Sequence, residues 1–426
     1  MEEEVIGADI RPTPQTMPEW LAAGAAHSLR RIGFGASQQE IEGALQAGRE
    51  TTIDELLARN ACDPILDRGL PSLLAAGKVQ SLAAWWIARI LDGGAPFVER
   101  IALMWHNHFA TSFAKVDDAR LMHDQVQLFR DHGRGDFRKL LRRVAKDPAM
   151  LLWLDGNENR LGNPNENFAR ELFELFALGL GAYDEKDVQE AARAFTGWGV
   201  DRRRFAFRER YHDAGEKQVL GSRGNFDGNG VLEIALAHPE CPRWIARRLL
   251  VEFVHPRPRA TEIDAWAKVL LEEDWNIELT CRRLFLSDLF LSPRARLSRI
   301  SGPVELIAGA ARSMGARPAP AALARASADM GQNLYQPPSV QGWTGGRDWI
   351  HAGTWLARHN SLVHLAYSAV DQGLGWNADT LLSVLLPGGA PAPLRQAVEF
   401  ELRKRSRSAI ADATALVLTS PEAQLA

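Results

Sequence analysis

Asn163-Pro-Asn-Glu-Asn-Phe-Ala-Arg-Glu-Leu-Phe-Glu174 is the stretch that most clearly predicts the fold. Asn163 can cap a helix, Pro164 suits the first helical position, and Glu166 stands where a capping-box carboxylate reaches back. At about 100° per residue, four polar side chains then share one stripe: Asn167, Arg170, Glu171 and Glu174. The rest of the surface is apolar: Phe168, Leu172, Phe173, Leu175, Phe176 and Leu178. Such a helix is usually buried, so its charges are expected to face a slot or line a polar cavity.

The same helical periodicity extends along most of the chain. It predicts further helices at 118–134, 136–147, 164–179 and 185–196, among others. The fold class is therefore mainly α: a large multi-helical globular fold. One irregular insert rich in Gly and Arg, 199–230, is predicted to carry one or two short strands, around 204–207 and 218–220. We expect an N-terminal extension (1–24) and a single helical domain (25–426), in which a Pro/Gly linker (387–393) precedes a C-terminal helix at 394–418.

Bulk properties exclude several classes of protein. The 426 residues are 46% hydrophobic and carry a formal net charge of −3, which argues against a protein that neutralises nucleic-acid phosphates. Three distant cysteines make neither a disulfide framework nor a zinc-binding pair. No apolar run is long enough to span a membrane, and the acidic N-terminus is unlike a signal peptide. We therefore expect a cytoplasmic protein without a nucleic-acid partner.

The polar stripe has two interpretations. Arg170 and Glu174 are spaced for an ion pair one turn apart, which would contribute little on a solvated face. The alternative is a functional site, because the surrounding Phe and Leu residues leave little room for a wide solvated face. The residue pattern leaves both open.

Two histidines lie among apolar residues in the helical segment 96–113. If the helix continues through both, His106 and His108 point about 200° apart and cannot bind one ion together. If it ended at Trp105, they could converge. Each could instead be a hydrogen-bonded core histidine, because buried polar groups are nearly always satisfied.

A loop and a group of tryptophans supply further candidates. His212-Asp213, with Lys217 nearby, could take part in acid–base chemistry or binding, although a solvated surface loop is the simpler interpretation. Thirteen tryptophans are present, and Trp343, Trp349 and Trp355 occur close together in sequence, where ring edges could bind a sugar. The residues assigned to substrate binding are Asn167, Lys217, Trp198 and Trp343. No phosphate-binding glycine loop, nucleophile elbow or zinc-protease motif is present.

Several long motifs occur in a fixed order: His27-Ser-Leu-Arg-Arg-Ile-Gly-Phe-Gly35, Met104-Trp-His-Asn-His-Phe109, Asp147-Pro-Ala-Met150, Asn163–Glu174, Glu190-Ala-Ala-Arg-Ala-Phe-Thr-Gly-Trp198, His212-Asp213 with Lys217, and Gly342-Trp343. In these the chain resembles the bacterial domain-of-unknown-function 1800 family, from about residue 25 to residue 424. The resemblance implies one family-length unit and supplies no activity. Many members look exported, so export stays open beside the cytoplasmic expectation.

Two hypotheses of function follow. The first is an enzyme whose buried polar site draws on His106, His108, Arg170, Glu171, Glu174 and His212. In a metal-assisted version, a divalent ion is bound by His106, His108 and Glu171. The second is a non-catalytic binding or scaffold protein with a Trp-rich surface that contacts a glycan or a partner. The substrate, a small molecule or a glycan, and the oligomeric state are left open.

Overall fold

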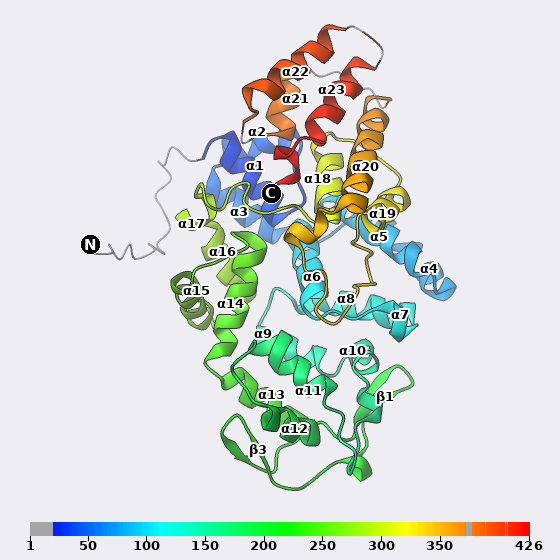
Figure 1. Cartoon of the computed structure of the whole chain (residues 1–426), viewed down its shortest axis with the longest axis vertical. Helices are drawn as coiled ribbons and strands as arrows, with labels where there is room; N and C mark the ends of the chain where they lie inside the picture. The colour runs from blue at the N-terminus through cyan, green and yellow to red at the C-terminus, as the bar shows by residue number, and fades with distance from the viewer. Residues whose placement is uncertain (1–19, 372–376, 388, 405, 407) are drawn as a thin grey trace, which may run out of the picture.

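The computed structural model describes residues 20–371, 377–387, 389–404, 406 and 408–426. Most of the predicted N-terminal extension and one position of the Pro/Gly linker lie outside these ranges. The described chain is mainly α, as predicted, and its only sheets are two antiparallel pairs of short strands (Figure 1). No described helix is both long and apolar enough to cross a membrane.

The described part of the first third of the chain forms helices and no strand. Its elements are α1 (Ala22–Ile32), α2 (Gln38–Ala47), α3 (Arg49–Ala58), the 3₁₀-helix η1 (Pro64–Asp67), α4 (Leu70–Ala76), α5 (Val79–Asp92), α6 (Pro96–His108), α7 (Phe113–Val116), α8 (Ala119–His132) and α9 (Phe137–Val144). Every residue of α6 from its start to His106 is buried, and the helix packs against α1, α3, α5 and α8. Pro96 begins this helix, where its missing N–H costs no hydrogen bond.

The second part forms one end of the molecule. It contains α10 (Pro148–Trp153), η2 (Gly156–Glu158), α11 (Asn167–Glu171), the π-helix η3 (Leu172–Ala177), α12 (Glu185–Ala194), β1 (Trp198–Asp201), β2 (Arg204–Phe207), η4 (Glu209–Tyr211), β3 (Lys217–Val219), β4 (Ser222–Gly224) and α13 (Gly228–Ala237). Strands β1 and β2 pair with Trp198 opposite Phe207, and β3 and β4 pair with Lys217 opposite Gly224. The strands predicted around 204–207 and 218–220 are present, but their partners β1 and β4 were not predicted.

The remaining helices run along one side and cover the opposite end. They are α14 (Glu240–Phe253), α15 (Ala260–Glu272), α16 (Ile277–Phe285), α17 (Asp288–Leu291), α18 (Pro303–Ser313), α19 (Pro320–Asp329), η5 (Gly346–Trp349), α20 (Ala352–Asp371), α21 (Ala378–Leu385), α22 (Ala392–Arg403), α23 (Ala409–Leu418) and η6 (Glu422–Gln424). The prediction of one helix over 394–418 is wrong. Helices α22 and α23 pack against each other, and α23 also packs on α20. The chain therefore reverses direction between α22 and α23, which buries apolar faces that one straight helix would leave exposed.

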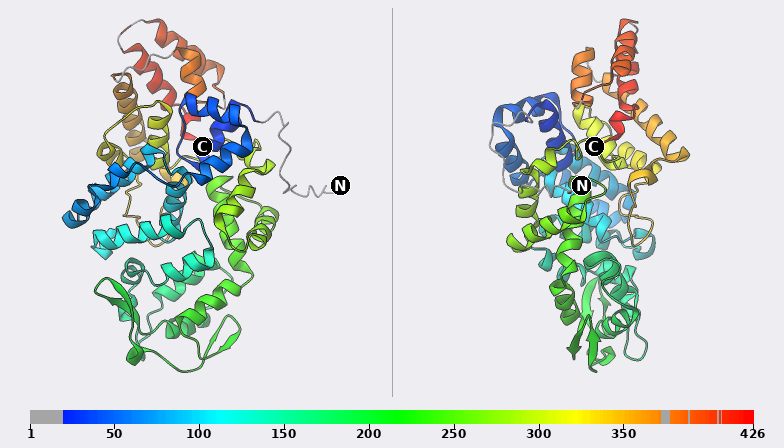
Figure 2. Two further views of the ribbon diagram at one scale, coloured as in Figure 1. Left: turned by 180° about the vertical axis from the view of Figure 1, so that it is seen from behind. Right: turned by 60° about the vertical axis from the view of Figure 1, so that its left-hand side comes forward.

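The two ends of the described chain meet. Seen from behind, the blue helices α1–α3 lie at the same end of the molecule as the orange and red helices α21–α23 (Figure 2). Arg31 on α1 is fully buried and donates hydrogen bonds to the backbone oxygens of Ala295 at 2.9 Å and Ala426 at 2.7 Å. A buried guanidinium needs several acceptors, and these carbonyls supply them.

Candidate functional site

The helix predicted over 164–179, with Asn163 as its cap, begins three residues later, at Asn167. Asn163 and Arg160 exchange backbone hydrogen bonds in a tight turn, so Asn163 does not cap a helix. The Oδ1 atom of Asn165 accepts from the backbone N–H of Asn167 at 2.9 Å, at the first residue of α11. Glu166 makes no capping box and pairs with Arg170 at 2.9 Å. The predicted capping roles of Asn163 and Glu166 are therefore wrong, because the preceding turn holds the chain in another conformation.

A wide turn interrupts the polar stripe between Glu171 and Glu174. Residues 172–177 form a π-helix, which ends with the backbone N–H of Leu178 donating to the carbonyl of Phe173 at 3.0 Å. Single π-turns inside α-helices are frequent at functional sites. Phe173 and Phe176 are buried on one side of this turn, while Glu174 stays half-buried.

Glu171 and Glu174 form a small acidic cluster with Tyr183. The Tyr183 hydroxyl donates to Oε2 of Glu174 at 3.2 Å. Glu171 is half-buried, and no hydrogen bond or ion pair engages its carboxyl within the described residues. Burial and then the neighbouring Glu174 raise the pKa of Glu171 to about 7, while Arg170 opposes them. Burial and then Glu174 raise the pKa of Tyr183 to about 12, so its hydroxyl remains a donor at neutral pH.

Arg170 and Asn167, the other members of the stripe, have partners outside the cluster. Arg170 pairs with Glu166 and, at 2.7 Å, with Glu185 at the start of α12, so the pair with Glu174 that its spacing suggested does not form. The amide of Asn167 donates to Asp155 at 3.0 Å. Both residues hold α11 in place, which leaves Glu171 as the carboxyl of the stripe without a partner.

His106 is a core histidine. It is fully buried, its Nε2 accepts from the backbone N–H of Tyr335 at 3.1 Å, and its ring lies beside Trp86 and Trp343. Burial, with a smaller effect from Arg130, lowers the pKa of His106 to about 3. The imidazole is therefore neutral and serves as a backbone acceptor.

His108 lies on another face of α6. Its Nε2 is 3.1 Å from the carbonyl of Phe176 in the π-helix, to which it donates, and its ring packs on Trp105 and Phe109. Burial and then Arg248 hold the pKa of His108 well below its usual range. Because α6 continues to His108, the two histidines point apart, as the helical period requires.

The predicted metal ligands do not assemble. Within the described ranges, no group of three or more His, Cys, Asp or Glu side chains is arranged to hold a metal ion. His106 faces the loop at Tyr335, His108 faces the π-helix backbone, and Glu171 lies in the acidic cluster. The helical rotation of α6 therefore points His106 and His108 toward different parts of the protein.

His212 and Lys217 are held by the backbone of the insert. The Nδ1 atom of His212 lies 3.0 Å from the carbonyl of Thr196, to which it donates. Lys217 is 1% exposed, and its Nζ donates to the carbonyls of Asp213 and Gly215 at 2.5 and 2.9 Å. Burial lowers the pKa of Lys217, and Asp213 opposes it. Through these two hydrogen bonds the lysine ties the loop together.

The tryptophans assigned to substrate binding are packed inside the protein. Trp198 is 3% exposed and packs against Phe195 and Phe205. Trp343 is 5% exposed, and its backbone N–H donates to Oδ1 of Asn107 at 2.6 Å. Trp355 is exposed, but one exposed ring does not form the predicted Trp-rich surface.

The sequence did not predict the hydrogen-bond and ion-pair partners of the candidate site residues. Tyr183 binds Glu174 from the loop after the π-helix, Glu185 binds Arg170 from the next helix, and Tyr335 binds His106 from 229 residues away. Only Tyr183 had a usable signal. It is one of four tyrosines in the chain and follows a Gly-rich turn that directs the chain back over the helix.

The fold and this site define a multi-helical α protein with a half-buried carboxyl cluster on an interrupted helix. The chain belongs to the family described as Protein of unknown function (DUF1800), whose model matches residues 27–425. Comparison with curated proteins and with solved structures gave no match.

Proposed function

We propose that the protein is an enzyme in which Glu171 transfers protons to and from a small-molecule substrate. The observation that carries the proposal is an unpartnered, half-buried carboxyl whose pKa is raised to about 7. A group that titrates near neutral pH is well suited to both accept and release a proton there. Perturbed carboxyls of this kind are concentrated at functional sites.

The neighbouring residues have separate roles in this proposal. Glu174 acts on the Glu171 carboxyl by charge repulsion, and Tyr183 positions Glu174 through its hydroxyl. Arg170 binds Glu185 and so fixes α11 against α12. Glu174, Tyr183 and Arg170 are positioning residues, and Glu171 is the one expected to contact the substrate.

Replacing Glu171 by Gln tests whether this carboxyl serves function at the expense of stability. The raised pKa of Glu171 means that the folded chain disfavours the charged carboxylate. The charge of Glu171 therefore does not destabilise the fold below about pH 4.5, and it destabilises the fold fully above about pH 7. With allowance for solvent screening, we expect Glu171→Gln to raise the free energy of unfolding by about 1–2 kcal/mol at about pH 8 and by nothing near pH 4.5. Urea unfolding at both pH values measures this.

Glu166→Gln is the matched control, since Glu166 is on the same segment but is paired with Arg170 on the surface. Glu166→Gln is expected to lower the free energy of unfolding by less than about 1 kcal/mol. A structural carboxyl would behave differently, because removing one partner of a buried pair costs about 3–5 kcal/mol. A loss of that size for Glu171→Gln would refute the proposal. Any hydrolytic or isomerase activity of the chain should show an inflection near pH 7 that the variant lacks.

A further inference from the structure

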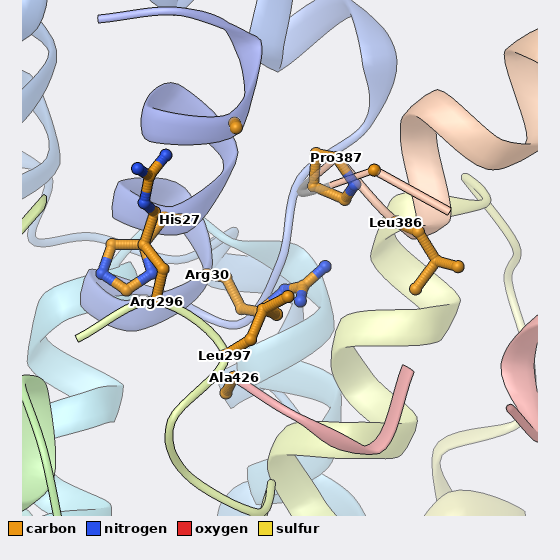
Figure 3. A pocket seen from close by; sticks show the side chains of 9 residues that line it. His27, Arg30, Arg296, Leu297, Leu386, Pro387 and Ala426 are labelled. Atoms are coloured by element: carbon orange, nitrogen blue, oxygen red, sulfur yellow. The ribbon is translucent and has the colours of Figure 1, made fainter. Parts of the chain in front are cut away.

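Two pockets of the described surface are lined by more than one cationic side chain. In the first, Arg30 and Arg296 lie close to His27 and to the last residues of the chain (Figure 3). The guanidinium of Arg30 is already engaged there, because it donates to the carbonyls of Leu425 and Leu385 at 3.3 and 3.5 Å. The second pocket has more cations, and most of them have no anionic partner.

The second pocket lies along α9, which packs against α8 and α13 (Figure 1). It is an open depression with a volume of about 520 Å³. The apolar residues of α9 are buried on the far side of the helix. Four cationic side chains line the pocket at a spacing of three or four residues, which places them on one face of α9 and of the turn that follows it: Lys139, Arg142, Arg143 and Lys146.

Within α9, only Arg142 of these cations has an anionic partner in the described chain. Its guanidinium donates to the two carboxylate oxygens of Glu233 at 2.6 and 2.7 Å. Lys139 and Arg143 are exposed, and their side chains make no hydrogen bond or ion pair with a described residue. Like charges one helical turn apart repel each other, so this arrangement costs stability as long as no anion is bound.

Lys146 is held in place by aromatic rings. Its Nζ lies 5.4 Å from the ring centroid of Trp198 and 5.5 Å from that of Phe205. The faces of these rings attract an ammonium group but carry no net charge. The C-terminus of α9 also attracts cations, although only with about half an elementary charge. Lys139, Arg143 and Lys146 therefore leave most of three positive charges without compensation.

The one carboxyl in the wall of the pocket, that of Asp147, is engaged inside the protein. Asp147 is 5% exposed, and its Oδ2 accepts from the side-chain amide of Gln125 at 2.8 Å and from the backbone N–H of Met150 at 2.9 Å. Burial is the main cause that raises the pKa of Asp147 to about 7, so the carboxyl carries only part of a negative charge at neutral pH. The pocket thus keeps an excess of positive charge.

This excess charge and the shape of the pocket limit the ligand. A phosphate group carries about −1.5 to −2 charges at pH 7, so two such groups match three cations better than one does. A volume of about 520 Å³ suits a small molecule. Because the apolar face of α9 is buried, this helix cannot insert into a lipid surface. The net charge of −3 for the whole chain disfavours a long polyanion such as nucleic acid.

We propose that this pocket binds a small soluble molecule that carries two phosphate groups. One phosphate contacts Lys139 and Arg143, which are one helical turn apart, and the other contacts Lys146. Arg142 stays paired with Glu233 and adds to the positive potential of the pocket. This site is separate from the proposed proton-transfer site at Glu171, and either can fail without the other.

Three matched sugars test the need for two phosphate groups in calorimetric titrations of the full chain. Fructose 1,6-bisphosphate carries two phosphates, fructose 6-phosphate carries one, and fructose carries none. The bisphosphate is expected to bind with saturation, about tenfold more tightly than the monophosphate, and more weakly as sodium chloride is added. Equal affinity of the bisphosphate and the monophosphate, or no saturable binding of the bisphosphate, would overturn the proposal.

A double variant assigns the binding to this pocket. Lys139→Gln combined with Arg143→Gln changes two exposed side chains without partners, so the fold should be kept, and it is expected to weaken the bisphosphate about tenfold. The matched control is Lys186→Gln, at an exposed position on α12, which should leave the affinity unchanged. If the double variant binds the bisphosphate like the unmodified chain, the assigned pocket is wrong.

Sedimentation with vesicles separates a soluble ligand from a lipid headgroup. The unmodified chain is expected to stay in the supernatant when mixed with vesicles of phosphatidylcholine and phosphatidic acid. Sedimentation with these vesicles that is lost in the double variant would show that the cations bind a lipid surface, and would overturn the proposal of a soluble ligand.

His132 supplies a readout that does not depend on the double variant. Burial and then Arg143 lower the pKa of His132, whereas Asp131 opposes them. A phosphate bound at Arg143 offsets that positive charge, so the pKa of His132 should rise when fructose 1,6-bisphosphate saturates the protein and should not change with fructose. Nuclear magnetic resonance of the ring protons, assigned by their loss in His132→Gln, measures this. A pKa of His132 that the bisphosphate leaves unchanged would show that no phosphate lies at Arg143.

Discussion

His106 shows what a buried histidine does when it is not a ligand. Its Nε2 accepts the backbone N–H of Tyr335, a residue with a φ of 65°, where a side chain is strained. The hydrogen bond holds that strained backbone against α6. The cost is a second ring nitrogen, Nδ1, without a partner among the described residues.

This burial makes the stability of the protein sensitive to acid. The pKa of His106 is lowered to about 3, so below pH 6.5 the unfolded chain takes up a proton that the folded chain does not. Stability is therefore lost as pH falls from about 6.5 toward 3. Replacing His106 by Gln, which can still accept from Tyr335, should reduce the loss between about pH 7.5 and 5.5 by about 1 kcal/mol. Urea unfolding at the two pH values tests this; parallel losses in both proteins would contradict it.

At the scale of elements, one buried carboxylate joins three helices. Glu99 on α6 accepts from Arg89 on α5 at 2.8 Å, from Arg130 on α8 at 3.1 Å, and from the indole N–H of Trp86 at 2.8 Å. It is 1% exposed. The three helices thus share a charge that only their joint packing can satisfy.

Replacing Glu99 by Gln leaves the buried guanidinium of Arg130 without its anion, while Arg89 keeps its ion pair with Asp67 at 3.0 Å. We expect the free energy of unfolding to fall by about 3–5 kcal/mol in denaturant titrations. Glu233→Gln removes a carboxylate from an exposed pair with Arg142 and should cost less than about 1 kcal/mol. Equal losses for the two variants would show that burial of the Glu99 network does not matter.

The helical elements were predictable where local periodicity decides and unpredictable where distant residues do. The segments 118–134, 136–147 and 185–196 agree with α8, α9 and α12. The start of α11 was missed because contacts from elsewhere hold the preceding loop, with the N–H of Leu161 donating to Tyr211 and that of Asn165 donating to Asn159. The π-turn at 172–177 likewise depends on the residues that pack against it. The amino-acid sequence of this segment resembles that of an ordinary α-helix, so the π-turn could not be predicted.

At the scale of the whole molecule, the motif His27–Gly35 meets a helix far along the chain. Gly35 has a φ of 91°, and a Cβ there would lie 2.8 Å from the carbonyl oxygen of Gly309 on α18. Only glycine permits both this conformation and this approach of two backbones. The contact holds the segment after α1 against α18.

Replacing Gly35 by Ala should therefore destabilise the protein by about 2–4 kcal/mol, through backbone strain and the clash together. The matched change Gly309→Ala places its Cβ 3.4 Å from the carbonyl of Phe34 and should cost less than about 1 kcal/mol. Thermal and urea unfolding of both variants measure the difference. A mild effect of Gly35→Ala would contradict the close approach.

For the molecule as a whole, the α class followed from the sequence, whereas the meeting of particular helices did not. Two residues of the candidate site, Glu171 and Glu174, were identified from the sequence. A mostly apolar helix is usually buried, so charged side chains on it must face solvent through a narrow opening or line a polar cavity. Tyr183 was not identified. The Gly-rich turn before it indicates that the chain reverses, but a turn alone does not show that the Tyr183 hydroxyl reaches Glu174. The separation of His106 from His108 was one of two predicted alternatives, and the length of α6 decides between them.

The central claim is that the Glu171 carboxyl titrates near neutral pH. The most direct test is a ¹³C titration of its Cδ resonance, assigned by its disappearance in Glu171→Gln. We predict an apparent pKa near 7, which falls when Glu174 is replaced by Gln because a neighbouring negative charge is removed. A Glu171 carboxyl that titrates near 4.5 in both proteins would contradict the account.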